Sequence, residues 1–280
     1  MSSKNLLLIS NHPLDQSFAT EVALSAGLSL KTAPDAVQGA LILASEDIQI
    51  VIADASTAEQ YQALEAAIQA QVGLFSDKVN GNAFHFISGN DLDLAPYLIL
   101  SPLFGSFILR NFENAKDAGE RYGKVIKATL DGHAFGLQKF VKEGTKIQTL
   151  KLASSTQKQE AVDAVRNFLL AAKFQTRMAA VIANAVDELL MNAMFDAPVD
   201  ELGKQIHAAL PRSTPLKLEK KAEVEMQIAF DGNCVAITAV DLCGSLEKVK
   251  LMSHIAKGYR REEHNVRTTT ARADIGLATV

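Results

Sequence analysis

The sequence predicts an α/β protein of two domains, a doubly wound parallel sheet followed by an α/β sandwich. From Asn5 to Leu100, short apolar runs alternate with helical stretches, which is typical of a parallel sheet covered on both faces. Further along, an apolar helical stretch precedes two alternating apolar runs around Asp231-Gly232, a strong hairpin signal. The 280 residues, 48% of them hydrophobic, are enough for two packed cores.

The elements of the first domain follow from the apolar runs and from helix-start signals such as Pro34 and Asp35. We expect strands at Leu6–Ser10, Leu28–Thr32, Ile48–Ala53, Phe84–Ser88 and Tyr97–Leu100. We expect helices at Gln16–Ala26, Ala36–Ser45 and Thr57–Gln71. This domain is predicted to cover residues 1–101.

The middle segment, residues 102–132, is predicted to be one long amphipathic helix. Apolar residues recur at three- and four-residue steps from Leu103 to Leu130. Two interpretations stay open: a connector packed along both domains, or a helix that pairs with its twin in a homodimer, which we favour slightly. The turn at Asp131-Gly132-His133 predicts the boundary of a second domain, residues 133–280.

The second domain is predicted to combine a sheet with long helices. We expect strands at Ile147–Ala153, Val224–Phe230 and Val235–Val240, and helices at Gln157–Ala172 and Met178–Met194. In the second helix Glu188 and Asn192 are four residues apart, so a carboxylate and a carboxamide lie on the same helical face.

The charge, the apolar runs and the cysteines of the chain exclude several classes of function. The net charge is −4 and the basic residues are dispersed, so nucleic acid is not expected as a partner. The apolar run Leu6–Ile9 is too short for a signal peptide or a membrane span, so we expect a cytoplasmic protein. Cys234 and Cys243 have no metal-ligand spacing and indicate reduced core thiols.

Residues that follow the predicted parallel strands are candidates for chemistry, since ligands bind at the carboxyl edge of such sheets. They are Asn11 and His12, Asp54, Ser88, and Ser101-Pro102. Over about residues 5–110 this arrangement resembles the receiver domain of bacterial response regulators. The resemblance implies that Asp54 is a possible phosphoacceptor, with Ser88 and Pro102 matching the residues after the fourth and fifth strands.

Two positions depart from the receiver pattern. Asn11 and His12 stand where the family has an acidic pair that holds Mg²⁺, and Ser101 stands where it has a lysine. A phosphoaspartate needs the charge of that metal and that lysine to be stabilised. We therefore interpret the first domain as a pseudo-receiver.

The second domain carries three separated boxes in a defined order. They are Asp187-Glu188-Leu189-Leu190-Met191-Asn192-Ala193, then Asp241-Leu242-Cys243-Gly244-Ser245 after the hairpin, and a terminal Gly276-Leu277. Over about residues 145–280 the order resembles the GHKL family of ATP-binding domains, in particular the anti-sigma-factor serine kinases and, more broadly, the histidine kinase-like ATPases.

The GHKL resemblance implies a role for each box. Asn192 would coordinate Mg²⁺ against the triphosphate, Glu188 would be the general base, and Asp241 would accept a hydrogen bond from the adenine amino group. Gly244 and Gly276 would let the backbone approach the nucleotide. In the family, however, the glycines lie two and four residues after the aspartate, where Cys243 and Ser245 stand here, and two of the three glycines of the last box are missing.

Together these resemblances predict a bacterial signal-transduction regulator of the two-component type. It would bind ATP and Mg²⁺ and act on a protein partner as a serine- or histidine-type protein kinase, weak or inactive. The alternative is a non-catalytic protein-interaction scaffold in which both domains have lost phosphoryl and nucleotide chemistry.

Overall fold

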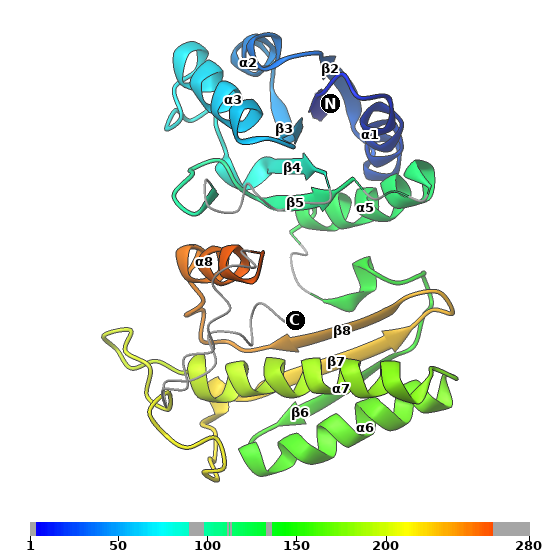
Figure 1. The fold of residues 1–280 in the computed structure, drawn as a ribbon, viewed down its shortest axis with the longest axis vertical. Coiled ribbons are helices and arrows are strands. Elements are labelled where there is room, and N and C mark those ends of the chain that lie inside the picture. Colours follow the sequence, from blue (N-terminus) through cyan, green and yellow to red (C-terminus); the bar gives the residue numbers. More distant parts are fainter. Residues whose placement is uncertain (1–3, 90–97, 111, 113, 133–135, 260–280) are drawn as a thin grey trace. The chain divides into compact units, whose positions relative to one another are not determined.

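A computed structural model describes residues 4–89, 98–110, 112, 114–132 and 136–259, with side chains described only as far as Ser253 in the last helix. The chain divides into two compact units (Figure 1). Of the described residues, unit 1 comprises those up to 132 together with 255–259, and unit 2 comprises 136–254. Each unit has its own sheet and is described by itself.

Unit 1 is built on a five-stranded parallel sheet with the strand order β2-β1-β3-β4-β5. The strands are β1 (Asn5–Ile9), β2 (Ser29–Ala33), β3 (Ile48–Asp54), β4 (Phe84–Ser88) and β5 (Ser106–Leu109). The helices are α1 (Pro13–Ala26), α2 (Ala36–Ser45), α3 (Ala58–Gln71) and α5 (Ala115–Leu130). Helices α1 and α5 cover one face, and α2 and α3 cover the other (Figure 1). The prediction of an α/β protein with a parallel sheet is therefore confirmed.

The last strand of unit 1 lies inside the segment predicted to be one long helix, so that prediction is wrong for the described residues before Ala115, where α5 begins. Gly105 and the residues after it pair with β4 instead. The amide of Gly105 donates to the Phe84 carbonyl at 2.7 Å, and a Cβ at Gly105 would lie only 2.0 Å from the Asn82 carbonyl oxygen. The strand predicted at Tyr97–Leu100 is also wrong over residues 98–100, and its first residue lies outside the described part.

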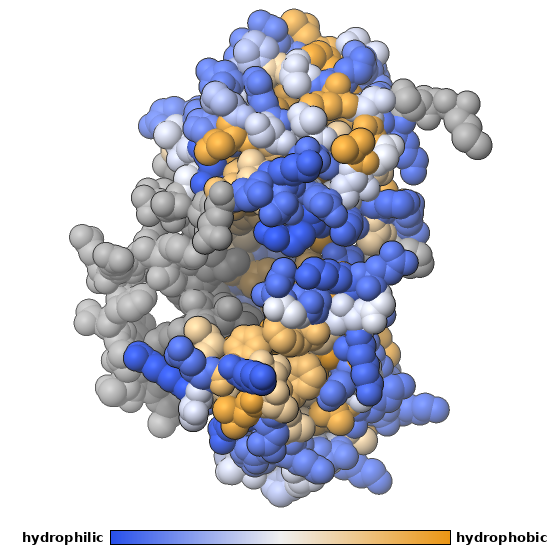
Figure 2. All heavy atoms as spheres, turned by 90° about the vertical axis from the view of Figure 1, so that its right-hand side faces the viewer, coloured by the Kyte–Doolittle hydropathy of each residue, from blue (hydrophilic) through white to orange (hydrophobic). Residues whose placement is uncertain are grey.

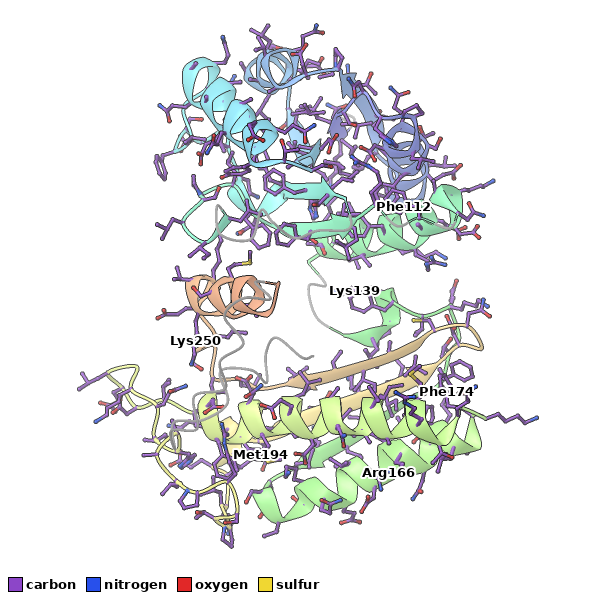
Figure 3. All side chains as sticks on the ribbon, in the orientation of Figure 1. Phe112, Lys139, Arg166, Phe174, Met194 and Lys250 are labelled. Carbon is purple, nitrogen blue, oxygen red and sulfur yellow. The ribbon has the colours of Figure 1, made fainter. Side chains whose placement is uncertain are left out.

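Helix α5 is closely packed against α1 of the same unit. A Cβ at Gly119 would approach the Phe18 carbonyl oxygen to 2.5 Å, and one at Gly123 would approach the Ser25 Cβ to 2.6 Å. Phe112, which precedes the helix, stacks on Phe18 with ring centroids 4.6 Å apart (Figure 3). The apolar face of α5 is thus used inside unit 1, and its remaining face carries charged residues.

Unit 2 combines a three-stranded antiparallel sheet with two long helices. The strands, in the order β6-β7-β8, are β6 (Ile147–Leu152), β7 (Val224–Phe230) and β8 (Val235–Val240). The helices are α6 (Lys158–Ala171) and α7 (Thr176–Met191), and a further helix, α8 (Lys248–Tyr259), follows β8. The hairpin turns at Asp231-Gly232 as predicted, with Gly232 at a φ of 95°.

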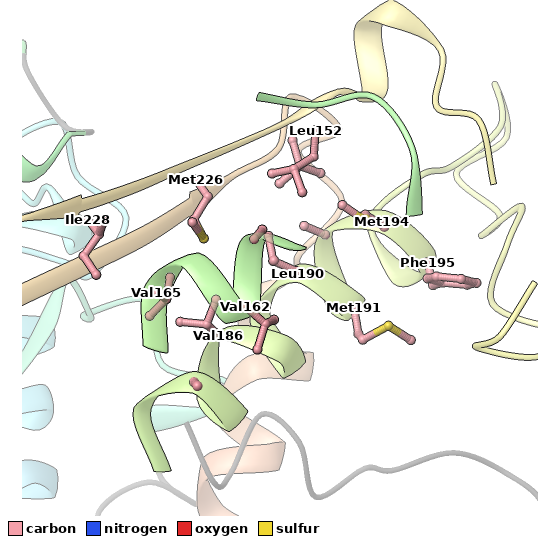
Figure 4. Packing of buried hydrophobic residues seen from close by; sticks show 14 of the residues in the cluster. Leu152, Val162, Val165, Val186, Leu190, Met191, Met194, Phe195, Met226 and Ile228 are labelled. Atoms are coloured by element: carbon pink, nitrogen blue, oxygen red, sulfur yellow. The ribbon is translucent and has the colours of Figure 1, made fainter. Parts of the chain in front are cut away.

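The core of unit 2 lies between the sheet and the pair α6 and α7. Apolar side chains from one face of the sheet and from the facing stripes of both helices meet there (Figure 4). They include Leu152, Val162, Val165, Val186, Leu190, Met226 and Ile228. Phe174 closes one end of this core edge-to-face on Phe230, with ring centroids 5.3 Å apart (Figure 3).

One helical segment among the described residues, Thr176–Asp196, is long and apolar enough to cross a membrane. Its most apolar positions are buried against the sheet and α6, however, as expected for a core helix. Polar residues cover most of the face drawn in Figure 2, and apolar residues form smaller groups between them. The described residues therefore carry no strong signal of a membrane span.

Candidate functional site

The carboxyl edge of the parallel sheet gathers polar residues from three strands. Asp54 is the last residue of β3, and Arg110 directly follows β5. Asp15 lies in the first turn of α1, which follows β1, and its side chain is completely buried. Because the strands are parallel, these three side chains meet at one edge.

Arg110 binds both carboxylates. Its Nε and Nη2 atoms donate to the two oxygens of Asp15 at 2.8 and 2.7 Å, a bidentate pair. The same Nη2 lies 2.8 Å from Oδ1 of Asp54, and Nη1 donates to the Ser56 hydroxyl at 2.9 Å. The Ser56 hydroxyl in turn donates to Asp54 Oδ1 at 2.7 Å, and that of Ser10 donates to Asp15 Oδ2 at 2.7 Å. One guanidinium is therefore the shared centre of a closed network.

The charge state of Arg110 follows from its contacts with the two carboxylates. The side chain of Arg110 is 13% exposed, as is that of Asp54, while that of Asp15 has no exposure. The hydrogen bond to Asp15, and then that to Asp54, keeps the pKa of Arg110 above its ordinary value despite partial burial. The cation thus stays charged and neutralises one of the two carboxylates.

Four members of this network were not predicted as site residues: Asp15, Arg110, Ser10 and Ser56. The prediction placed Ser101 at the end of the fifth strand, which is wrong because β5 begins only at Ser106. Ser101 instead lies buried, and its hydroxyl accepts a hydrogen bond from Tyr61. The apolar run before Arg110, Phe107-Ile108-Leu109, is too short to be distinguished as a strand by pattern alone, so it gave no clear signal for this residue.

The residues directly after β1 have a structural role. His12 is the N-cap of α1, and its Nδ1 accepts a hydrogen bond from the Leu14 amide at 3.2 Å. Asn11 is exposed. The carboxylate near β1 therefore comes from Asp15 in the helix, not from the loop position where the receiver pattern has its acidic pair.

In unit 2, Asn192 lies where α7 passes into a single π-helical turn, Asn192–Asp196. Single π-helical turns are rare in proteins, and those that occur often lie at functional sites. The Nδ2 atom of Asn192 is buried and has no hydrogen-bond partner among the described residues. Glu188 lies one turn earlier and is half-buried. The neighbouring Asp187 pairs with Lys158 of α6, which leaves Glu188 as the carboxylate beside Asn192.

Arg212, from the loop between α7 and β7, fixes the end of the π-helical turn. Its Nη2 lies 2.7 Å from Asp196 Oδ2, and its Nη1 donates to the Met191 carbonyl at 3.3 Å. The guanidinium also lies over the Phe195 ring, 5.3 Å from its centroid. A guanidinium paired with Asp196 thus contacts the backbone of the residue before Asn192, a feature that the sequence did not reveal.

The loop after β8 approaches the same turn. The Ser245 hydroxyl donates to the Ala197 carbonyl at 2.6 Å, which ties the Asp241 loop to the C-terminal end of the π-helical turn. Asp241 Oδ1 accepts from the Cys243 amide at 2.9 Å. Burial raises the pKa of the Cys243 thiol, and so do the charge of Asp241 and a hydrogen bond to it.

Of the two glycines of the predicted nucleotide site, Gly244 is among the described residues. Gly244 has a φ of 64°, so the turn after Asp241 uses a backbone conformation that favours glycine. Gly276 lies outside the described residues. The structure therefore brings together the segments of Asn192 and Asp241, while the third predicted box stays a prediction.

A comparison of the chain with protein-family models, with curated proteins and with solved structures finds no match. Among the described residues, no group of three or more His, Cys, Asp or Glu side chains is placed to hold a metal ion. The assignment of function accordingly depends on the geometry of the two sites.

Proposed function

We propose that the chain is a bacterial signal-transduction regulator in which unit 1 is a pseudo-receiver and unit 2 is an ATP-binding, GHKL-like module that acts on a protein partner. The observation that carries the nucleotide half is the unpartnered Nδ2 of Asn192, buried in a π-helical turn that Ser245 ties to the Asp241 loop. A buried polar group without a partner is destabilising, so such groups are often completed by a ligand.

The residues present fit Mg²⁺-ATP in part. The carboxamide of Asn192 offers one oxygen to a cation and an unpaired donor to a phosphate oxygen. Arg212 donates to the carbonyl of Met191, the residue before Asn192, while its charge is paired with Asp196. Asp241 Oδ1 accepts from the Cys243 amide, and an adenine amino group would be a further donor to this carboxylate. Bound Mg²⁺-ATP would supply a γ-phosphoryl group for transfer.

Within that reaction, the side chains of unit 2 have separate tasks. Asn192 would position the triphosphate, and Glu188, one turn earlier on the same face, would accept the proton of the attacking hydroxyl. Asp241 would favour adenine, because its carboxylate can accept from the adenine amino group but not from a carbonyl oxygen at the same position.

Isothermal titration of Mg²⁺-ATP into the purified chain tests this proposal. We expect saturable binding that Asn192→Ala and Asp241→Asn both abolish. Asn184→Ala is the matched control, since Asn184 is on the same helix but exposed, and it should bind as the wild type does. Glu188→Gln should keep binding and lose turnover of ATP to ADP. Absence of binding heat at saturating ATP would contradict the nucleotide proposal.

The second candidate is a protein-interaction scaffold without nucleotide chemistry. It is favoured by Cys243 and Ser245, which stand where the GHKL pattern has glycines and which already hold Asp241 and the π-helical turn in place. Asn192→Ala separates the two candidates. A variant that signals normally in cells supports the scaffold, whereas loss of signalling together with loss of ATP binding supports the nucleotide-dependent regulator.

A further inference from the structure

The carboxyl edge of unit 1 has the composition of a divalent-cation site but is filled by the chain's own cation. A single nitrogen, Arg110 Nη2, contacts Asp15 at 2.7 Å and Asp54 at 2.8 Å. The two carboxylate oxygens therefore lie around one cationic nitrogen. Mg²⁺ is bound in proteins through such carboxylates, with water completing its shell.

The guanidinium provides the charge pairing that a bound metal ion would otherwise provide to the two carboxylates. Both oxygens of Asp15 accept from Arg110, and Oδ2 also accepts from Ser10, so this completely buried carboxylate is fully paired. Oδ1 of Asp54 accepts from Arg110 and from the hydroxyl and amide of Ser56. A divalent cation could enter only by displacing a bidentate, charge-assisted pair from a site with little solvent access.

The same contacts disfavour phosphoryl chemistry at Asp54. Transfer from acetyl phosphate would form an acyl phosphate on Asp54 and release acetate, adding negative charge beside Asp15. In receiver-type sites a metal offsets such charge, and here the single guanidinium already serves two carboxylates.

We propose that Arg110 is the resident cation of this edge: it fills the position between Asp15 and Asp54, so that native unit 1 takes up neither a divalent cation nor a phosphoryl group. It also links β5 to β1 and β3 through side chains, since it follows β5, while Asp54 ends β3 and Asp15 lies in the helix that follows β1. The arrangement of β5, and of α5 after it, is thereby independent of metal and of phosphoryl donors.

The experiment compares the full chain with Arg110→Ala, using thermal unfolding with MgCl₂ or EDTA and intact mass after incubation with acetyl phosphate. The wild type should show no Mg²⁺-dependent change in unfolding midpoint and no added phosphoryl group. In Arg110→Ala, Mg²⁺ should raise the midpoint by several degrees, because a ligand that binds only the folded state stabilises it. Asp54→Asn in the same variant should remove that rise. Arg121→Ala, an exposed arginine of α5, is the matched control and should behave as the wild type.

Each outcome decides the proposal. A Mg²⁺-dependent shift or a phosphoryl adduct on the wild type overturns it, whatever the variants do. A folded Arg110→Ala without any Mg²⁺ response also overturns the claim that the guanidinium stands in for a metal. If Arg110→Ala does not fold without metal, refolding in Mg²⁺ but not in EDTA supports the proposal, and failure in both overturns it. Arg110→Lys, which keeps the charge, should fold and remain insensitive to Mg²⁺.

Discussion

The ion pair of Asp15 and Arg110 should be a major determinant of the stability of unit 1. Replacing Arg110 by Met keeps an unbranched stem but removes the charge and both bonds to a carboxylate that has no solvent exposure. Removing one partner of a buried, hydrogen-bonded pair costs about 3–5 kcal/mol, because the other charge is left uncompensated. Ser10 still donates to Asp15, so we expect the lower half of that range.

A double-mutant cycle measures this contribution. The variants Arg110→Met, Asp15→Asn and their combination are unfolded in urea with EDTA present. Tyrosine fluorescence is a convenient probe, because the chain has no tryptophan and Tyr61 and Tyr122 both belong to unit 1. The double variant should lose about 1–3 kcal/mol less than the sum of the single variants, since Asn leaves no buried charge.

The control and the refuting result are both quantitative. Arg121→Met, on the exposed face of α5, should change the free energy of unfolding by less than about 0.5 kcal/mol. If Arg110→Met loses less than about 1 kcal/mol, or if the two single losses simply add, the pair does not form as described and the reasoning fails.

Three further predictions concern packing and titration. Gly123→Ala should destabilise the chain by about 1–3 kcal/mol in urea unfolding, because its Cβ would collide with α1; a gain in stability, as at an exposed helical glycine, would show that α5 is not packed there. Burial lowers the pKa of His85 to about 4, whereas an unfolded imidazole titrates near 6.5. The contribution of neutral His85 to the free energy of unfolding should therefore be fully present above about pH 6.5. It should fall by up to about 3 kcal/mol as the pH is lowered to 4. His85→Gln should lack that decline, and an identical pH profile in the variant would contradict the assignment. In a variant that keeps Cys243 as its only cysteine, Asp241→Asn should speed alkylation by iodoacetamide near neutral pH. The reason is that the Asp241 carboxylate is one cause of the raised pKa of the Cys243 thiol. An unchanged rate would mean that Asp241 does not act on the thiol.

The local elements were largely predictable because strong local signals define them. The predicted helix Ala36–Ser45 and the predicted strands Phe84–Ser88, Val224–Phe230 and Val235–Val240 coincide with the observed elements, and Thr57 caps α3 through a reciprocal capping box. These segments carry clear periodicity, Asx or Thr caps, or an Asp-Gly turn. The face shared by Glu188 and Asn192 follows from the helical repeat in the same way.

The elements around β5 were not predictable from local pattern. The residues Leu103, Phe107 and Ile108 recur at helical spacing, but the free energy of pairing with β4 outweighs that preference, and strand preference depends strongly on such context. That error displaced the carboxyl end of the fifth strand, and with it the identity of the cation beside Asp54.

What the sequence determined by itself is therefore the chemistry that lies within one element or one turn: the strand–helix alternation, the hairpin, Asp54 at a strand end, and the carboxylate and carboxamide of α7. Only the tertiary structure decided which side chains meet. Asp15, Asp54 and Arg110 are 39 to 95 residues apart in sequence. Their contact exists because three parallel strands end at one edge of a sheet, and no local pattern records that proximity.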